Sequence, residues 1–152
     1  MTSHMRHVGH LVVQVCDGIG EVYIRYQSPM PGPRGVPLGI FALANGLAWS
    51  RHLSDQEYAE WRASNDWYNV VCPDPSATDP LAYDRERNPL AAAWFKESAT
   101  HLLERVTPYL EILGSHGVAC VRVEAEDPGR IIYEDDVQVV VVPRRDQAHP
   151  FS

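Results

Sequence analysis

Apolar and β-branched residues dominate two short stretches near the start of the chain. The first covers residues 8–16 (VGHLVVQVC), and the second, residues 21–27 (EVYIRYQ), alternates apolar positions with Tyr23 and Arg25. Alternation with a period of two is typical of a strand that packs one face. Residues 17–20 between them read Asp-Gly-Ile-Gly, which is the chemistry of a tight turn. We therefore predict a β-hairpin that pairs the two stretches.

A helical periodicity follows the proline- and glycine-rich loop at residues 28–39. From Gly39 onward, apolar residues recur every three or four positions, which predicts a first helix. Ser54 and Glu57 have the spacing of a capping box, which predicts the start of a second helix. The inner stripe of that helix comprises Tyr58, Trp61, Asn65, Tyr68 and Cys72.

Residues 72–89 (CPDPSATDPLAYDRERNP) combine prolines and acidic residues without any periodicity. An irregular segment of this length is unusual inside a compact domain, and such segments often serve as lids or binding loops. We expect this loop to close over a binding site.

The pattern after this loop predicts a third helix, with Asn88 as its cap and Pro89 at its first position. Its core arc runs from Phe95 to Leu113 at about 100° per residue. Pro108 lacks an amide hydrogen, so we expect it to kink or restart this helix.

Three strands are predicted after this helix, at residues 118–126, 130–134 and 137–143. In the first we expect Val121 and Val123 to point inward, with Arg122 and Glu124 in water. The last strand is apolar on both faces, as interior strands are. The predicted helices cover only one face of the sheet, so we expect a second copy to cover the other and form a homodimer.

The order β-β-α-α-α-β-β-β predicts an α+β fold. We expect one mixed or antiparallel sheet of about five strands, with the helices packed on one face. A single domain would span residues 6–143, because 152 residues fit one hydrophobic core. Residues 1–5 resemble the scar of tag removal and are set aside as disordered. Residues 144–152 are polar and are expected to form a frayed tail.

Composition limits the classes of partner. The chain carries a formal net charge of −7, which argues against nucleic-acid binding because phosphates require clustered cations. No apolar run approaches the roughly 18 residues of a membrane span. Three scattered cysteines do not make a disulfide framework, so we expect reduced thiols and a cytoplasmic location.

Motifs for cofactors and metals are absent from the sequence. It contains no Walker loop, dinucleotide fingerprint, nucleophile elbow or His-Glu-x-x-His pair. We therefore expect neither a cofactor nor a metal. The acidic turn at residues 134–136 is interpreted as a solvated hairpin, because adjacent carboxylates on a tight turn point apart. Gln138 and Asn65 are expected to be buried and bonded to backbone groups.

The third predicted helix carries the main candidate site. At helical spacing, Trp94, Ser98, His101 and Arg105 form one row along an edge, combining an aromatic ring, a hydroxyl, an imidazole and a cation. Such a row could hold a planar or anionic ligand, with His101 as a catalytic acid or base. Lys96 is the only lysine of the chain and falls on the other margin. We expect its stem to cover apolar surface and its charge to remain in water.

Arg34 is a further ligand-binding candidate. It precedes the first predicted helix, and the amino end of a helix attracts anions. The alternative interpretation is an ordinary surface arginine in a loop.

The stretch GRIIYEDDVQVVVVP (129–143) resembles the opening hairpin of histidine-triad nucleotide-binding proteins. The His-x-His-x-His pattern that gives that family its activity has no counterpart here, so no activity is carried over. More broadly, residues 25–143 are similar to small uncharacterised actinobacterial proteins. That resemblance implies a bacterial cytoplasmic origin and supplies no function.

These observations favour a protein that binds a small ligand or a protein partner. The first alternative is a metal-independent enzyme that acts on an anionic or aromatic small molecule, with His101 as acid or base and residues 72–89 as lid. The second is a homo-oligomeric assembly subunit, which follows from the apolar final strand.

Overall fold

The computed structural model describes residues 3–8, 11–16, 21–78 and 88–144. The predicted tail beyond residue 144 and most of the predicted lid, residues 79–87, lie outside the described residues. None of the helices in the described ranges is long and apolar enough to cross a membrane.

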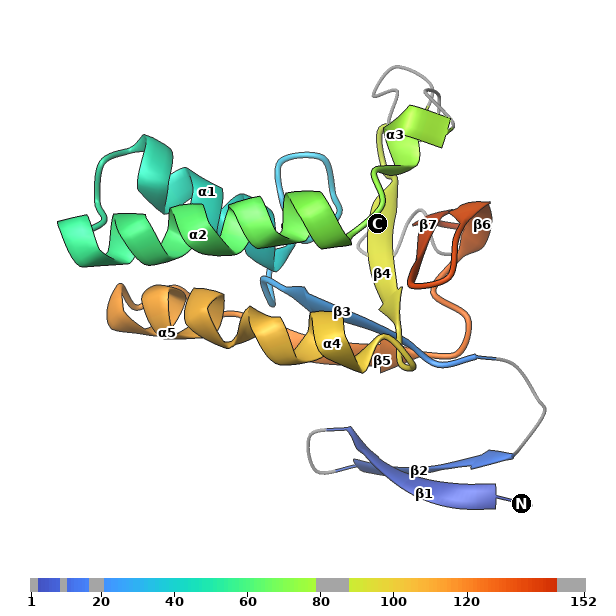
Figure 1. Cartoon of the computed structure of the whole chain (residues 1–152). Helices are drawn as coiled ribbons and strands as arrows, with labels where there is room; N and C mark the ends of the chain where they lie inside the picture. The colour runs from blue at the N-terminus through green and yellow to red at the C-terminus, as the bar shows by residue number, and fades with distance from the viewer. Residues whose placement is uncertain (1–2, 9–10, 17–20, 79–87, 145–152) are drawn as a thin grey trace.

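The fold is α+β, with a five-stranded antiparallel sheet and helices on one side of it (Figure 1). The strand order is β5-β3-β4-β7-β6, so β4 lies at the centre of the sheet, between β3 from the first part of the chain and β7 from the last part. The strands are β3 (Tyr23–Gln27), β4 (Ala92–Lys96), β5 (Val121–Ala125), β6 (Arg130–Glu134) and β7 (Gln138–Val142). The helices are α1 (Ile40–Trp49), α2 (Asp55–Val71), α3 (Pro75–Thr78), α4 (Thr100–Leu103), η1 (Glu104–Val106) and α5 (Thr107–Ser115).

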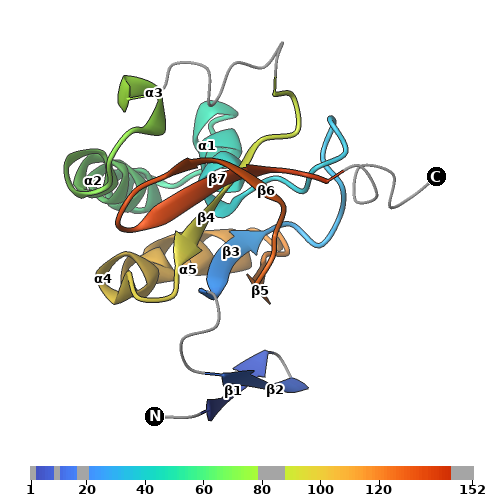
Figure 2. The ribbon, with the colours of Figure 1, turned by 90° about the vertical axis from the view of Figure 1, so that its right-hand side faces the viewer.

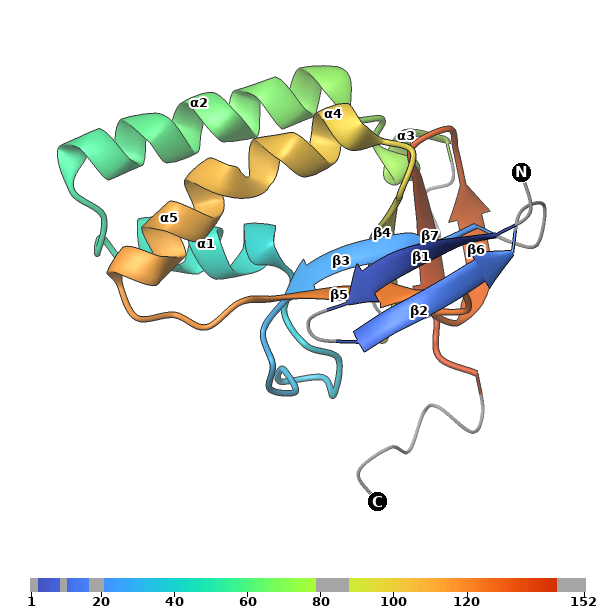
Figure 3. The same ribbon diagram turned by 90° about the horizontal axis from the view of Figure 1, so that it is seen from below.

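The predicted first hairpin is wrong in its pairing. Strand β2 (Leu11–Cys16) pairs with β1 (Ser3–Val8) in a separate two-stranded sheet, while β3 pairs with β4 and β5. Figure 3 shows β1 and β2 paired with each other, and Figure 1 shows this small sheet below the five strands. Strand β1 begins at Ser3, inside the segment that we set aside as a tag scar. The alternation marked both strands correctly, but it carried no information on which strand each would join.

The second helix begins where its capping box predicts. Ser54 Oγ accepts from the Glu57 amide at 3.1 Å, and Glu57 Oε1 accepts from the Ser54 amide at 2.9 Å. The predicted interruption near Pro108 is also confirmed, because a 3-10 turn separates α4 from α5 and the proline lies in the first turn of α5. These signals are local, so the sequence alone reports them.

The third predicted helix is wrong over residues 92–96, which form strand β4 at the centre of the sheet. Trp94 pairs with Val139 on β7, and Phe95 pairs with Ile24 on β3. An alanine-rich segment favours a helix by intrinsic propensity. Here hydrogen bonding to two neighbouring strands overrides that preference, and the helical segment starts only at Thr100.

Both sides of the final strand are covered within one chain. On the helix side, a large cluster of side chains from α1, α2 and the α4–α5 segment forms the core. On the other side, Val139 and Val141 are buried against Tyr23 and Trp94. Figure 2 shows β7 between its neighbours β4 and β6. The apolar character of β7 therefore needs no second copy to explain it, and the predicted homodimer rests on no other observation.

The side chains of strand β5 face the opposite sides of the sheet from those that we predicted. Its pairing sets Arg122 opposite Tyr26 and Glu124 opposite Ile24, on the face that the helices cover. The Glu124 side chain is only 4% exposed, whereas Val121 is 42% exposed. A shift of one position in the assumed face moves every side chain to the other side of a strand.

Candidate functional site

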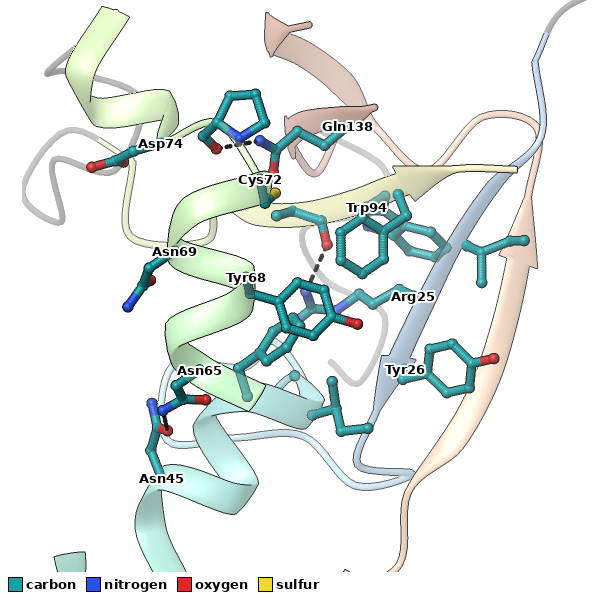
Figure 4. A pocket seen from close by; sticks show the side chains of 17 residues that line it. Arg25, Tyr26, Asn45, Asn65, Tyr68, Asn69, Cys72, Asp74, Trp94 and Gln138 are labelled. Atoms are coloured by element: carbon teal, nitrogen blue, oxygen red, sulfur yellow. Dashed lines mark hydrogen bonds between the residues drawn. The ribbon is translucent and has the colours of Figure 1, made fainter. Parts of the chain in front are cut away.

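A cavity of about 660 Å³ lies between the sheet and helices α1 and α2. This volume is within the range of small-molecule sites, which is roughly 300–1,000 Å³. Its lining comes from four places: β3 and β4, the start of α1, the carboxyl-terminal half of α2 with residues 72–74, and Gln138 on β7. Figure 4 shows the helical residues along one side and the strand residues along the other.

The cavity opens where two strands part. Strands β3 and β4 pair only at Tyr23 with Lys96 and at Ile24 with Phe95. Arg25, the next residue of β3, fills the resulting gap. Its Nη1 donates to the Ala93 carbonyl at 2.8 Å, and the dashed line in Figure 4 marks this bond. The guanidinium thus replaces part of the missing ladder between the strands.

Arg25 also fixes the loop that leads into α1. Its Nη2 donates to the Pro37 carbonyl at 2.9 Å, and its Nε donates to Gln27 Oε1 at 2.9 Å. A Cβ atom at Gly39 would lie 3.2 Å from the guanidinium, so glycine lets the start of the helix approach it closely. A charged donor bound to several acceptors is held in place.

Aromatic rings form the apolar part of the lining. Phe41 contacts Tyr68 edge-on at 4.9 Å between centroids, and Phe95 lies nearly parallel to Tyr68 at 6.4 Å. The Tyr68 hydroxyl donates to the Leu102 carbonyl at 2.6 Å, which ties α2 to α4. Burial raises the pKa of Tyr68, so it remains a neutral phenol. Phe41 and Phe95 are half-buried.

Amide side chains form the polar wall. Asn45 Oδ1 accepts from Trp61 Nε1 at 2.9 Å and from Asn65 Nδ2 at 3.3 Å. The Tyr109 hydroxyl in turn donates to Asn65 Oδ1 at 2.6 Å. Asn69 follows Asn65 by one helical turn, and in Figure 4 it lies at the outer edge of α2. The network fixes the first two amides in one orientation.

The far end of the cavity is closed by Gln138, which is 4% exposed. Its Nε2 donates to the Pro73 carbonyl at 2.7 Å and to Asp135 Oδ2 at 3.0 Å. The predicted burial and backbone bond of Gln138 are therefore confirmed, while Asn65 bonds to side chains instead. The neighbouring Cys72 is a free thiol, and burial raises its pKa to about 11.

The predicted row of site residues does not form. Trp94 lies on β4 and borders the cavity, but its side chain packs against Tyr23 and Val139 on the other side of the sheet, whereas Ser98 is exposed in the turn that follows. His101 is exposed on α4, and the cavity lining does not include it. The Arg105 guanidinium lies 4.3 Å from the centroid of the Trp67 ring, on the exposed side of η1. The predicted row required all four residues to lie on one helix, but residues 92–96 form strand β4 and the helix starts only at Thr100.

Arg34 is exposed in the loop before α1 and does not line the cavity. The arginine beside the start of α1 is Arg25, which reaches it from the neighbouring strand. Sequence spacing pointed to Arg34 because it is close along the chain. No signal in the sequence could reveal the closer contact from β3.

Lys96 is not at a helix margin. Its Nζ lies 2.7 Å from Glu134 Oε2, and its side chain is 13% exposed. The hydrogen bond with Glu134 raises the pKa of Lys96, which is the opposite of what a nucleophilic lysine needs. Asp135 organises the acidic turn by accepting from the amides of Val137 and Gln138. Both carboxylates therefore have structural partners.

No group of three or more His, Cys, Asp or Glu side chains in the described ranges could hold a metal ion. Comparison of the chain with protein-family models, with curated proteins and with solved structures found no match. The likeness to actinobacterial proteins therefore stays a prediction, and the geometry of the cavity is what bears on function.

Proposed function

We propose that this protein binds a small molecule in the cavity between the sheet and helices α1 and α2. The observation that carries the proposal is the combination of partly uncovered rings with amides held by their own hydrogen bonds. Binding sites are concave and mostly apolar, with a few polar groups at fixed positions that set the orientation of the ligand. Fixed side chains lose little freedom when a ligand arrives, which favours affinity.

Catalysis is not part of the proposal. The acid or base that the sequence suggested, His101, is outside the cavity lining. Inside it, burial keeps Tyr68 and Cys72 in their neutral forms at pH 7. A general acid or base works best with a pKa near the operating pH.

A cytoplasmic location belongs to the same proposal. Cys72 and Cys120 are both free thiols, and their burial raises the pKa of each. Thiols of this kind persist in a reducing compartment. A bacterial origin rests on the resemblance alone.

The test is a thermal-shift screen across nucleotides, sugar phosphates and aromatic metabolites, repeated on two variants. Ala93 lines the cavity on the same strand face as Phe95, so Ala93→Phe places a ring inside it. Ala63 is exposed on α2 and is not part of the lining, so Ala63→Phe is the matched control. We expect a ligand that stabilises the wild type and the control but not Ala93→Phe.

A ligand that stabilises all three proteins equally would contradict the proposal. If Ala93→Phe does not fold, chemical-shift mapping of the wild type decides the question. A ligand bound as proposed shifts the side-chain amide resonances of Asn45 and Asn65, whereas a ligand bound elsewhere leaves them unchanged.

A further inference from the structure

The lining of the cavity carries one positive and one negative side chain, so its formal net charge is zero. Among its 17 residues, the groups that carry charge at neutral pH are one guanidinium, Arg25, and one carboxylate, Asp74. Burial raises the pKa of the Cys72 thiol to about 11 and also raises the pKa of Tyr68, so neither side chain adds a charge at neutral pH. A dianionic phosphate entering this space would lose its water and face a single cation. Burying a charge without several compensating partners is strongly unfavourable.

The polar wall offers hydrogen bonds of both kinds without charge. A carboxamide carries a donor and an acceptor, and it keeps both at any pH between 5 and 9. In the described part of the chain, the Nδ2 of Asn45 and the side-chain amide of Asn69 make no hydrogen bond. Asn65 uses its Oδ1 for Tyr109 and one of its two Nδ2 hydrogens for Asn45. The Nδ2 of Asn45 and the second Nδ2 hydrogen of Asn65 are available to the edge of a ligand, whereas the exposed Asn69 points away from the strand side of the cavity in Figure 4.

The rings beside this wall favour a flat ligand. Phe41 and Phe95 are half-buried. Their ring centroids lie 6.3 Å apart, and the planes of the two rings are nearly perpendicular. Aromatic side chains prefer to stack on, or to meet edge-on, another planar ring. A ring with polar atoms on its edge would satisfy the amides and the phenyl groups together.

From this arrangement we infer that the cavity takes an uncharged planar heteroaromatic ligand with an amide-like edge of hydrogen-bond donors and acceptors, such as a nucleobase or an aromatic carboxamide. The inference rests on the proposed function, because it names the ligand class of the same cavity. The free ring is expected to bind in preference to its phosphorylated form.

The probes are adenine and nicotinamide, with AMP as the charged counterpart of adenine and benzoate as an anionic aromatic ring, titrated by calorimetry and by side-chain amide NMR. Asn45→Asp retains the acceptor oxygen that Trp61 and Asn65 use and removes the donor hydrogens. We expect it to weaken the binding of the neutral rings about tenfold, because a hydrogen bond is lost. Val70→Asp adds the same charge at an 86% exposed position of α2 outside the lining, and it should leave affinity within about twofold. If Asn45→Asp does not fold, the side-chain amide shifts of Asn45 and Asn65 in the wild type, compared between the neutral and the charged probes, decide the question.

The pH profile is a second readout. Neutral amides and neutral rings predict an affinity that is constant between about pH 5.5 and 8.5, whereas a histidine in the site would change it there.

The outcomes separate the ligand class from the binding function. If AMP or benzoate binds more tightly than the neutral rings and shifts the amides of Asn45 and Asn65, the inferred ligand class is wrong. The proposed binding function would still stand. Equal affinities of wild type and Asn45→Asp, or a strong pH dependence, also overturn the class. If no compound of any kind perturbs the amides that line the cavity, both proposals are wrong.

Discussion

The hydroxyl of Tyr109 is the innermost member of the network that holds the amide wall. Tyr109 is 0% exposed, and its hydroxyl donates to Asn65 Oδ1 at 2.6 Å. Tyr109→Phe removes that single bond and leaves the ring packing intact. A neutral hydrogen bond contributes about 1 kcal/mol net, and a half-buried acceptor left without its partner adds to the cost. We expect a loss of about 1.5 kcal/mol in the free energy of unfolding, measured by urea titration.

For a chain of this size such a loss lowers the Tm by about 3–6 °C. The matched control is Tyr58→Phe. That side chain is 49% exposed, and its hydroxyl has no hydrogen bond in the described part of the chain, so its removal should change stability by less than about 0.5 kcal/mol. A double-mutant cycle of Tyr109→Phe with Asn65→Ala should give a coupling energy of about 1 kcal/mol. A coupling energy near zero would refute the view that Tyr109 holds Asn65 in place.

Three further changes test other parts of the structure. Hydrogen bonds, first from the backbone of Ser54 and then from side chains at the end of α5, lower the pKa of Glu57 from 4.5 to about 2. Its contribution to stability is therefore present above about pH 4.5 and lost as the pH falls towards 2, so the difference in Tm between wild type and Glu57→Gln should shrink over that range. Gly129 has a φ of 154°, and a Cβ there would lie 2.5 Å from a carbonyl oxygen of β7. Gly129→Ala should cost about 2–3 kcal/mol in a denaturant titration, whereas Gly46→Ala in α1, with open space around it, should gain about 0.5–1 kcal/mol. Burial raises the pKa of Cys72, so iodoacetamide at pH 7.5 should label it at least about tenfold more slowly than in the urea-unfolded chain, as followed by peptide mass spectrometry.

Features that are written in a few consecutive residues could be predicted from the sequence. The capping box at Ser54 and Glu57 fixed the start of α2, and the turn at Asp135 separated β6 from β7. In each case the side chain bonds to backbone groups two or three residues away. All the interacting groups therefore lie within a few consecutive residues, where a sequence pattern can reveal them.

Strand β4 could not be predicted in this way. Its residues alternate, with Ala93 and Phe95 on the helix side and Trp94 and Lys96 on the other, but two alanines make the same segment a good helix former. The choice is made by β3 and β7, which lie about 70 residues before it and 45 residues after it. Tertiary pairing outweighs a propensity difference that amounts to less than about 1 kcal/mol per residue.

The predicted row of Trp94, Ser98, His101 and Arg105 does not form for the same reason. Once β4 is a strand, Trp94 and Lys96 face one side and the row that was to join Trp94 to His101 no longer exists. The residues that do line the cavity come from elements whose relative positions are set by the sheet. Asn65 attracted notice as a polar residue in an apolar stripe, which was the one sequence signal for the amide wall. Its partner Asn45 lies on another helix, and their contact depends on how α1 packs on α2.

The place of the single lysine follows from this geometry and bears on the ligand. Because side chains alternate along β4, Lys96 points away from Phe95 and forms its ion pair with Glu134 on the side of the sheet that faces away from the helices. On the cavity side, β4 presents Phe95, and the helices α1 and α2 present the amides of Asn45 and Asn65. The chain as a whole carries a net charge of −7, which repels polyanions at a distance. Long-range repulsion and a balanced interior act in the same direction, and both favour an uncharged ligand over a phosphorylated one.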